Sequence, residues 1–531
     1  MKKICFLLAL VMIFATFCSC GGSKNNSPLE GNVYLEGFPI VKEQETLEIF
    51  TVKTVTHGDF DEMGFTKYYE EKTNINVEWL LVSSEEIDSK LTLMFQSNSL
   101  PDIISLPLNL FGSERLLKYS KTGAVIQLDD LIDKYGTNIK AMFNKSPEAK
   151  AAALAADGKI YSLPTVQTMS NNHERFPQKL YIRKTWLDNL GLEIPKTAEE
   201  FYEVMTAFKN NDPNGNGQKD EIPFATRGID PSFFGNWGIS FNYNNDALCV
   251  DDNGKVSYGY ATDATKKALS FMNRLYSIGL CEMYDSDSKF KTKLKNGLVG
   301  AFYHLAAYTV VGTELADEYA MIEPFEGTSG VKPVMSVSGT YYPNTFVITS
   351  ACENPAAAIR WVDHFYSDEG YYLVTYGKEG EMIEKTSDGK WQYADYDTSK
   401  DRFTFTPGFV LPYYVDDNVL SNFVDKAESE MTEFELLDKK LDEETKNTYL
   451  GKAEPKNLIW MPAMDEQAQK IVDQYYDNIA EYAGSAMGEF ATGVRNIDTE
   501  WDAYIAELNK KGLPILLAEY QRLYDSVNAN K

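Results

Sequence analysis

The first part of the chain alternates short apolar runs with stretches whose apolar residues recur at helical spacing. Residues 46–52 form one apolar run, and residues 74–82 alternate at the two-residue period of a strand, with one face made by Ile75, Val77, Trp79 and Leu81. A helix is expected between them over 60–73, and a third strand over 100–105. Strands separated by helices run parallel through right-handed crossovers, so this pattern predicts an α/β unit.

Side chains that can bond the free amides of a first helical turn mark three further helices. Two pairs have the spacing of a capping box and one places an N-cap before proline: Ser83 with Glu86, Thr197 with Glu200, and Asn354 with Pro355. An apolar stripe follows each pair, made by Ile87, Leu91, Met94 and Phe95, by Phe201, Val204, Met205 and Phe208, and by Ile359, Val362, Phe365 and Tyr366. Helices therefore recur along the whole chain.

The length and composition of the chain exclude several classes of protein. At 531 residues the chain exceeds a single hydrophobic core, so two or more units are expected and two lobes are the simplest arrangement. The formal net charge of −27 repels a nucleic acid or an anionic membrane surface, so neither is expected as a partner.

The N-terminus has the layout of a secretion signal. Lys2 and Lys3 precede an apolar run over 5–17, which is shorter than the ~18 residues of a spanning helix. The end of this run, FCSCGG, resembles a bacterial lipobox, which implies cleavage after Ser19 and diacylglyceryl attachment to Cys20. Residues 1–19 are thus expected to be a signal peptide and residues 20–43 a polar tether from the extracellular face of the membrane. A lipid on Cys18, or plain secretion, is the alternative.

The three other cysteines of the mature chain give no metal or redox motif. Cys249, Cys281 and Cys352 lack CxxC spacing and are too few for a disulfide scaffold. One disulfide or three buried thiols both remain open.

The stretch NDPNGNGQKDEIP at 211–223 carries oxygen ligands at the spacing of a calcium loop. Loop positions 1, 3, 5, 7 and 9 correspond to Asp212, Asn214, Asn216, the backbone carbonyl of Gln218, and Asp220. Gly217 stands where the loop must turn, and Glu221 is expected to close the site because position 12 is Pro223. A structural calcium ion is predicted, and a solvated Asn/Gly turn is the alternative.

The stretches that begin like catalytic motifs lack the residues or the spacing that those motifs require. HERFP at 173–177 lacks the second histidine of HExxH, Gly377 and Lys378 lack the spacing of a P-loop, and no GxSxG occurs. With 78 acidic residues, a glycosidase-like carboxylate pair would arise by chance. No catalytic residue is predicted.

Six stretches follow one another in an order similar to that of one known family. They are SNSLPDII at 97–104, DGKIYSLP at 157–164, LYIRKTWLDNLGLEIPKTAEEF at 180–201, the loop of 212–221, YGKEGEMIEKTSDGKW at 376–391 and EFATGVRNIDTEWDAYIAELNKKGL at 489–513. Together they resemble the family 1 extracellular solute-binding proteins of ABC importers, in the LipO-like and alginate-oligosaccharide-binding branch. In that branch a similar loop binds calcium, which implies Asp212, Asn214, Asn216, Gln218, Asp220 and Glu221 as ligands.

The resemblance implies a two-lobe, periplasmic-binding-protein-like fold of type II, with a hinge and a solute cleft between the lobes. Lobe one would comprise 44–166 and 340–400, and lobe two 167–339 and 401–531. A solute that touches both lobes favours closure through the contacts it makes only in the closed state. The closed monomer would then deliver the solute to the permease subunits of an ABC transporter.

The resemblance also places candidate solute contacts in the cleft loops. Sugars stack their apolar faces on rings and need convergent polar partners, and 13% of the residues are aromatic. The candidates are His57, Glu174, Trp237, Tyr303, His304, Tyr341 and Tyr342. The alternatives are a surface position for His57, an ion pair for Glu174, and core or surface positions for the rings.

The leading hypothesis is a lipid-anchored receptor for an oligosaccharide or sugar derivative, without catalysis. A secreted polysaccharide hydrolase or lyase and a peptide- or signal-sensing lipoprotein are the alternatives, and turnover or peptide binding would distinguish them.

Overall fold

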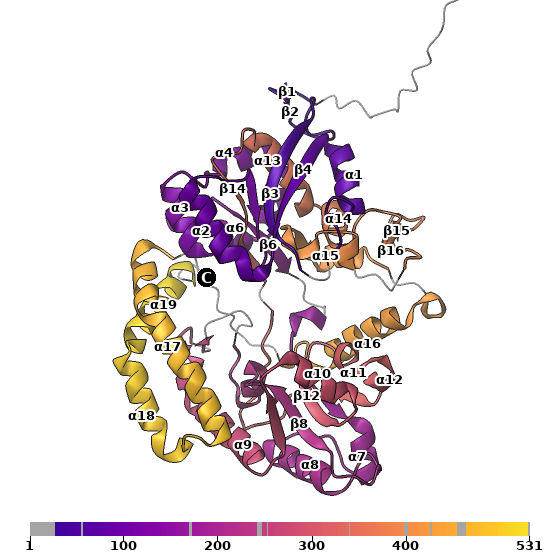
Figure 1. Cartoon of the computed structure of the whole chain (residues 1–531), viewed down its shortest axis with the longest axis vertical. Coiled ribbons are helices and arrows are strands. Elements are labelled where there is room, and N and C mark those ends of the chain that lie inside the picture. Colours follow the sequence, from indigo (N-terminus) through magenta and orange to yellow (C-terminus); the bar gives the residue numbers. More distant parts are fainter. Residues whose placement is uncertain are drawn as a thin grey trace, which may run out of the picture.

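The computed structural model describes residues 27–54, 57–168, 173–241, 247–251, 253–338, 340–397, 402–424, 427–453 and 464–528. Figure 1 shows two lobes, one above the other, each with its own sheet. Two separate hydrophobic cores correspond to the two lobes. The expected two-lobe α/β architecture is confirmed.

The first lobe is built on a six-stranded sheet. Its order is β17 (Tyr414–Asp416), β6 (Leu163–Thr168), β14 (Tyr341–Ile348), β5 (Ile103–Ser105), β3 (Glu45–Val52) and β4 (Ile75–Val82). β14 runs antiparallel to both of its neighbours, and the other strands run parallel to one another. The strands expected over 46–52, 74–82 and 100–105 are therefore β3, β4 and β5.

Helices cover both faces of this sheet. They are α1 (Gly64–Thr73), α2 (Ile87–Ser97), α3 (Ser113–Lys121), α4 (Asp129–Tyr135), α5 (Thr137–Lys145), α6 (Pro147–Ala153), α13 (Pro355–Asp363), α14 (Asp368–Tyr376) and α15 (Asp417–Ser421). The hairpins are β1 (Leu29–Glu30) with β2 (Val33–Tyr34) and β15 (Ile383–Lys385) with β16 (Trp391–Tyr393). Short 3₁₀ helices are η1 (Ser84–Glu86), η5 (His364–Tyr366), η6 (Arg402–Thr404) and η7 (Gly408–Val410).

The second lobe has a five-stranded sheet. Its order is β11 (Cys281–Tyr284), β8 (Ile222–Arg227), β12 (Val299–His304), β7 (Lys179–Arg183) and β13 (Tyr319–Met321). β8, β11 and β12 run parallel, and β7 runs antiparallel to its neighbours β12 and β13. A small hairpin, β9 (Leu248–Val250) with β10 (Val256–Tyr258), packs into the same core.

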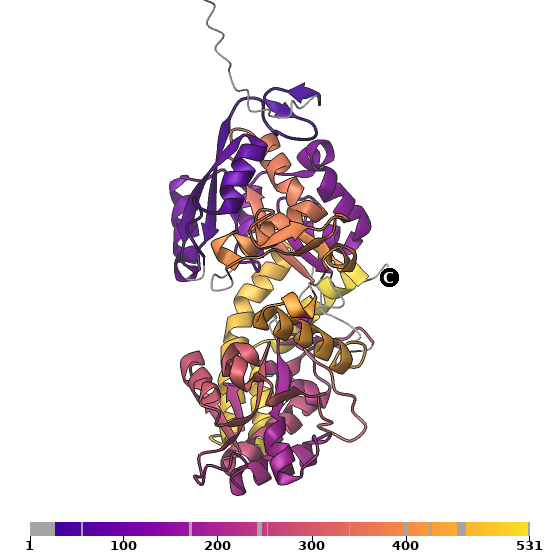
Figure 2. The ribbon, with the colours of Figure 1, turned by 90° about the vertical axis from the view of Figure 1, so that its right-hand side faces the viewer.

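Many of the helices of this lobe come from the C-terminal third of the chain. Its helices are α7 (Lys184–Leu190), α8 (Ala198–Asn210), α9 (Asp263–Ser277), α10 (Asp287–Lys295), α11 (Tyr308–Val311), α12 (Thr313–Ala316), α16 (Glu433–Thr448), α17 (Glu466–Thr492), α18 (Ile497–Lys510) and α19 (Leu513–Asn528), with 3₁₀ helices η2 (His173–Arg175), η3 (Pro231–Trp237), η4 (Gly259–Ala261) and η8 (Glu428–Glu430). Figure 2 shows the yellow helices extending from the lower lobe to the level where the lobes meet.

The three helix starts predicted from the sequence agree with the structure to different degrees. Asn354 accepts from the Ala357 amide, and Pro355 opens α13 as predicted. The Thr197 side chain accepts from the Glu200 amide at 3.2 Å, but the Glu200 carboxylate turns to the Lys196 amide. At α2 the predicted capping box is wrong, because the Ser83 hydroxyl donates to the Glu86 carboxylate and a 3₁₀ turn comes first.

The lobe boundary expected at residue 401 lies too early in the chain. β17 pairs with β6, and Val410, Leu411 and Val419 lie in the core of the first lobe. Residues 402–424 therefore belong to lobe one. A strand of three residues carries too little pattern to show which sheet it will join.

The expected tether is also shorter than predicted. Residues 1–26, including the signal peptide and Cys20, lie outside the described residues, but Ile40 and Val41 are fully buried in the first core. The Arg360 guanidinium donates to the carbonyls of Tyr34 and Gly37. The segment after residue 28 therefore packs onto lobe one instead of spanning a gap.

Candidate functional site

The strand ends at which the two sheets face each other are of the same kind in both lobes. In the first lobe, Val166 near the end of β6 pairs with Tyr341 at the start of β14, and both strands continue there into segments that lead to the second lobe. In the second lobe, Lys179 at the start of β7 pairs with His304 at the end of β12. The carboxyl ends of the parallel strands of both sheets therefore meet between the lobes, where α/β proteins bind ligands.

We call these strand ends and the segments beside them the interlobe face. In lobe one it comprises residues 53–54, 57–58, 83–86, 106–112, 145–146, 168, 340–344 and 416–417, and in lobe two residues 173–179, 227–230, 284–291 and 304–308.

Backbone bonds tie the connecting segments to one another. The Gln167 amide donates to the Thr340 carbonyl at 2.8 Å, and the Ser338 amide donates to the Arg175 carbonyl at 2.8 Å. In the third connection, the Val424 amide donates to the Trp391 carbonyl at 2.7 Å. Each connection is thus held at the edge of a lobe by backbone hydrogen bonds.

His173 links the first connection to α16. Asp442 Oδ1 accepts from the His173 amide at 2.9 Å and from its Nδ1 at 2.6 Å. Asp438, one turn earlier on α16, lies 3.7 Å from Nε2 and accepts from the Tyr308 hydroxyl at 3.1 Å. This histidine therefore positions α16 beside the interlobe face.

His57 lies on the interlobe face, but its ring is buried and engaged. Its Nδ1 accepts from the Thr54 amide at 3.0 Å, which places the proton on Nε2, 3.1 Å from the Pro407 carbonyl. Phe60 and Phe403 pack against the ring. In this conformation His57 shapes the loop after β3, and the alternative of a surface residue does not hold.

Trp237 and Tyr303 lie in the core of the second lobe. Trp237 is 4% exposed and packs against Phe233 and Phe271. Tyr303 is equally buried, with its hydroxyl accepting from Asn236 Nδ2 at 2.9 Å, and burial raises the pKa of Tyr303 well above its usual range. These are the core positions considered as alternatives, and a run such as FFGNWG gives no periodicity that distinguishes core from cleft.

The remaining candidates are better placed. His304 at the end of β12 is half-buried, and burial lowers its pKa to about 4, so the ring is neutral at physiological pH. Tyr341 and Tyr342 at the start of β14 are half-buried, and the Tyr341 hydroxyl lies 3.3 Å from Ser146 Oγ. The side chain of Glu174 lies outside the described part of the chain. The structure thus brings His304, Tyr341 and Tyr342 to the interlobe face.

One residue that the sequence reasoning missed is Leu108, in the loop after β5. Its side chain is 55% exposed, and both Leu108 (φ 53°) and Asn109 (φ 61°) adopt the left-handed conformation that non-glycine residues avoid. The buried Asn344 donates to Asn109 Oδ1 at 2.8 Å and fixes this loop. An exposed leucine held in a strained backbone points to a functional contact. Three leucines in SLPLNLFG were the available signal.

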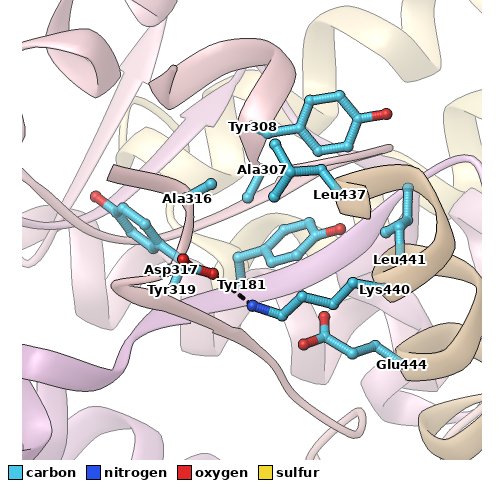
Figure 3. A pocket seen from close by; sticks show the side chains of 10 residues that line it. All are labelled: Tyr181, Ala307, Tyr308, Ala316, Asp317, Tyr319, Leu437, Lys440, Leu441 and Glu444. Carbon is cyan, nitrogen blue, oxygen red and sulfur yellow. Dashed lines mark hydrogen bonds and ion pairs between the residues drawn. The ribbon is translucent and has the colours of Figure 1, made fainter. Parts of the chain in front are cut away.

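A small pocket lies within lobe two instead of between the lobes. Figure 3 shows Lys440 of α16 reaching Asp317, with Glu444 beside it and Tyr181 and Tyr319 opposite. Its volume of about 30 Å³ is room for one or two waters, far below the roughly 300–1,000 Å³ of ligand sites. The pocket lies where α16 packs against the sheet of lobe two. Burial raises the pKa of Glu444 there.

The loop of 212–221 lies at the opposite end of lobe two, before the start of β8. Asp212 accepts from the amides of Asn216 and Gly217, at 3.1 and 2.9 Å, and adopts a positive φ of 46°. Burial, followed by the charges of Asp220 and Asp212, raises the pKa of Glu221. Within the described residues, no three His, Cys, Asp or Glu side chains converge as a metal site, so the acidic groups of this loop alone do not form one.

The cysteines and helices complete the description. Cys249, Cys281 and Cys352 are free thiols, and burial raises the pKa of Cys249 and Cys352 to about 12. In the ranges that the structure describes, no helix has both the length and the apolar character needed to cross a bilayer.

Comparisons with known proteins agree with this geometry. The family model of bacterial extracellular solute-binding proteins matches residues 54–372. The fructooligosaccharide ABC transporter substrate-binding protein FusA of Streptococcus pneumoniae is 28% identical over 98% of both chains.

Solved structures give the same picture. The structure of FusA in complex with kestose covers 92% of this chain and 100% of that one, with 26% identity and a TM-score of 0.77, and a second structure is of a FusA EF-hand mutant. The alginate-binding protein AlgQ2, solved without calcium ion, matches the fold at a TM-score of 0.70, with 21% identity over 94% of this chain and 100% of that one.

Proposed function

The chain belongs to the family of bacterial extracellular solute-binding proteins, and from this premise we propose that it captures an oligosaccharide or sugar derivative between its lobes and delivers it to an ABC permease. One observation carries the proposal: the carboxyl ends of the parallel strands of both sheets lie at the junction of the two lobes. Three chain segments connect the lobes there, and each is held by backbone hydrogen bonds. The family binds solutes and does not transform them, which supports a receptor without catalysis.

The solute contacts proposed are candidates on the interlobe face that are not fully buried. Tyr341 and Tyr342 come from lobe one and His304 from lobe two, so a bound sugar would touch both halves. Leu108 adds an apolar side chain suited to the C–H face of a sugar ring. His57, Trp237 and Tyr303 are supporting residues, since each is buried in this conformation.

The calcium ion is part of this proposal, and the loop has features that fit one. The side-chain oxygens of Asp212, Asn214 and Asn216 accept backbone amides of the loop at 3.1, 2.9 and 2.7 Å. The side-chain nitrogens of Asn214 and Asn216 lie 3.4 and 3.1 Å from Asp220 Oδ1, so the oxygen-bearing side chains of the loop converge as a calcium site requires. Glu221 Oε1 is buried without a hydrogen-bond partner in the described part of the chain. With the Gln218 carbonyl, these groups would hold calcium and stiffen the start of β8, far from the solute.

Lipid attachment at Cys20 would place the receptor at the extracellular face of the membrane, beside its permease. The relative LipO of Bacillus subtilis, 22% identical over about half of each chain, is named a lipoprotein. Metabolic labelling with a fatty-acid analogue tests this step, and Cys20→Ser should abolish the label while Cys18→Ser should not.

A thermal-shift screen of oligosaccharides and peptides, followed by product analysis, tests the function. A solute at 100 times its Kd stabilises the fold by about 2.7 kcal/mol. If the protein is a receptor, at least one glycan should raise its melting temperature and should be recovered chemically unchanged. Small-angle scattering should then show a smaller radius of gyration for the protein with that glycan bound. A cleaved glycan would favour the hydrolase or lyase, and a shift with peptides alone would favour the sensing lipoprotein.

A further inference from the structure

Lys53 directly follows the last residue of β3, at the carboxyl end of the sheet of lobe one. Its backbone amide donates to the Val82 carbonyl of β4 at 2.8 Å. The next residue is held as well, because the Thr54 amide donates to His57 Nδ1 at 3.0 Å. The side chain of Lys53 is half-buried and therefore extends from a fixed backbone on the interlobe face.

The Lys53 ammonium has no hydrogen-bond or ion-pair partner among the described residues. The nearby Glu86 carboxylate accepts from the Ser83 hydroxyl at 3.1 Å instead. Every other lysine and arginine of the interlobe face is engaged: these are Lys145, Arg175, Lys179, Arg227, Lys289 and Lys291. Lys53 thus differs from them in offering three N–H donors that no group in the described part of the chain takes up.

The strand register places Lys53 beside Leu108. β3 and β5 run parallel, with Phe50 opposite Ile104. Continuing this register by three residues places Lys53 opposite Pro107, the residue before Leu108. A half-buried ammonium and a 55% exposed leucine therefore lie next to each other at the end of this strand pair.

The same edge of the sheet continues into β14. The Leu106 amide donates to the Thr345 carbonyl at 2.7 Å, so the loop after β5 lies against the first half of β14. Tyr342, the second residue of β14, is half-buried there. With neighbouring strands ~4.8 Å apart, the row from Lys53 through Leu108 to Tyr342 spans roughly 10 Å. The row combines a cationic donor, an apolar side chain and an aromatic ring.

We propose that Lys53 is a solute-binding residue whose ammonium donates hydrogen bonds to oxygen acceptors of the bound sugar, while Leu108 and Tyr342 contact its apolar faces. This inference rests on the proposed function and adds a residue that supplies hydrogen-bond donors from lobe one. A solute seated on the row removes water from the ammonium, and an unpaired cation without water is costly. A sugar oxygen that accepts its hydrogen bonds offsets this cost, so Lys53 favours solutes that place an oxygen there.

Replacing Lys53 with methionine tests the contact, with fructo-oligosaccharides, malto-oligosaccharides and oligogalacturonate as calorimetric probes. The affinity for the probe that binds the parent protein should fall by roughly ten- to a hundredfold, as expected for hydrogen bonds from a charged group. Lys53→Arg keeps the charge and the donors and should retain more of the affinity than Lys53→Met.

The matched control is Lys42→Met, at the amino end of β3. Lys42 is 58% exposed and lies beside the β1–β2 hairpin at the top of Figure 1, so its loss should leave the affinity unchanged. Unchanged affinity in folded Lys53→Met would overturn the inference and leave the transport function intact. A loss that comes only with a lower melting temperature of the unliganded variant would also overturn it. A parent protein that binds no sugar would overturn both proposals.

The salt dependence identifies the acceptor on the sugar. If Lys53 meets a carboxylate, the affinity for oligogalacturonate should fall as salt rises, and Lys53→Met should reduce that dependence. If it meets hydroxyls, the affinity for a neutral oligosaccharide of equal length should fall by the same factor at every salt concentration. Either result supports the contact and names its chemistry.

Lysine acetylation read by peptide mass spectrometry gives an independent readout on the unmodified chain. Lys53 should react in the free protein and be protected at a saturating concentration of the probe that binds, whereas Lys42 should react equally in both states. Equal labelling of Lys53 with and without the bound sugar would contradict the contact.

Discussion

The Lys179 ammonium at the start of β7 donates a 2.9 Å hydrogen bond to the carbonyl of Leu305, just past the end of β12. Two more bonds run from the same nitrogen to the His173 and Phe176 carbonyls in the connection between the lobes. A single buried cation thus joins the connecting segment to the sheet edge that faces the other lobe. These three bonds fix the residues before β7 against that edge of the sheet.

Replacing Lys179 with methionine should lower the free energy of unfolding by about 2–4 kcal/mol, because several buried carbonyls lose their donor. Urea denaturation followed by tryptophan fluorescence measures the loss. Lys184→Met, at a lysine that is 57% exposed, serves as the control and should change the stability little. Equal stability of the two variants would show that the buried ammonium does not organise this edge.

Stability should fall as the pH is lowered from about 6.5 to 4. Burial lowers the pKa of His304 and of His364 to about 4, whereas the unfolded chain binds these protons near 6.5. Each histidine therefore destabilises the fold by up to about 2–3 kcal/mol as the pH drops through this range. Unfolding curves at several pH values should show a shallower slope for His304→Asn and for His364→Asn. A slope identical to that of the parent protein would contradict the assignment.

Calcium should raise the melting temperature without altering the solute site. The loop of 212–221 lies at the opposite end of lobe two from the interlobe face, so its ion would act on stability. Saturation at 100 times the Kd corresponds to about 2.7 kcal/mol. Asp212→Asn with Glu221→Gln should remove the response to calcium, and Glu203→Gln, an exposed acid on α8, should retain it. Loss of solute affinity at unchanged stability would argue against a structural ion.

Replacing Leu108 with glycine should raise stability and weaken solute binding. Glycine relieves the left-handed strain at φ 53°, so Leu108→Gly should gain up to about 1 kcal/mol of unfolding free energy, whereas Leu108→Ala should not. Both variants should lose about tenfold in solute affinity if the side chain contacts the sugar. Denaturation and calorimetry on the same preparations separate the two effects. Unchanged affinity in both variants would remove Leu108 from the site.

Trp237 and Tyr341 should respond in opposite ways. Trp237→Phe should lower stability by about 1–3 kcal/mol through a packing defect and leave solute affinity unchanged, since the ring is 4% exposed. Tyr341→Phe should weaken solute binding with little effect on unfolding. The reverse result would return Trp237 to the list of contacts.

Local signals were reliable wherever one segment decides its own structure. The Asn354 and Pro355 start of α13 and the strand β4 depend on neighbours in the chain, and both were found. Leu81, expected on one face with Ile75, Val77 and Trp79, is exposed instead, and Val82 is buried. The capping box predicted at Ser83 was wrong because the Ser83 hydroxyl donates to the Glu86 carboxylate. Among the solute candidates, His304, Tyr341 and Tyr342 reached the interlobe face, but nothing local told them apart from the buried Trp237 and Tyr303.

The sequence by itself determined the alternation of helices and strands, the resemblance to a family, the oxygen-rich loop and the absence of a catalytic motif, since each is carried by residues close together in the chain. Only the tertiary structure decided that residues 402–424 return to lobe one, that Lys145 meets Asp416, and that Leu108 is held in a left-handed turn by Asn344. These outcomes depend on segments more than two hundred residues apart. Their energies come from burial and pairing that exist only once both sheets have formed.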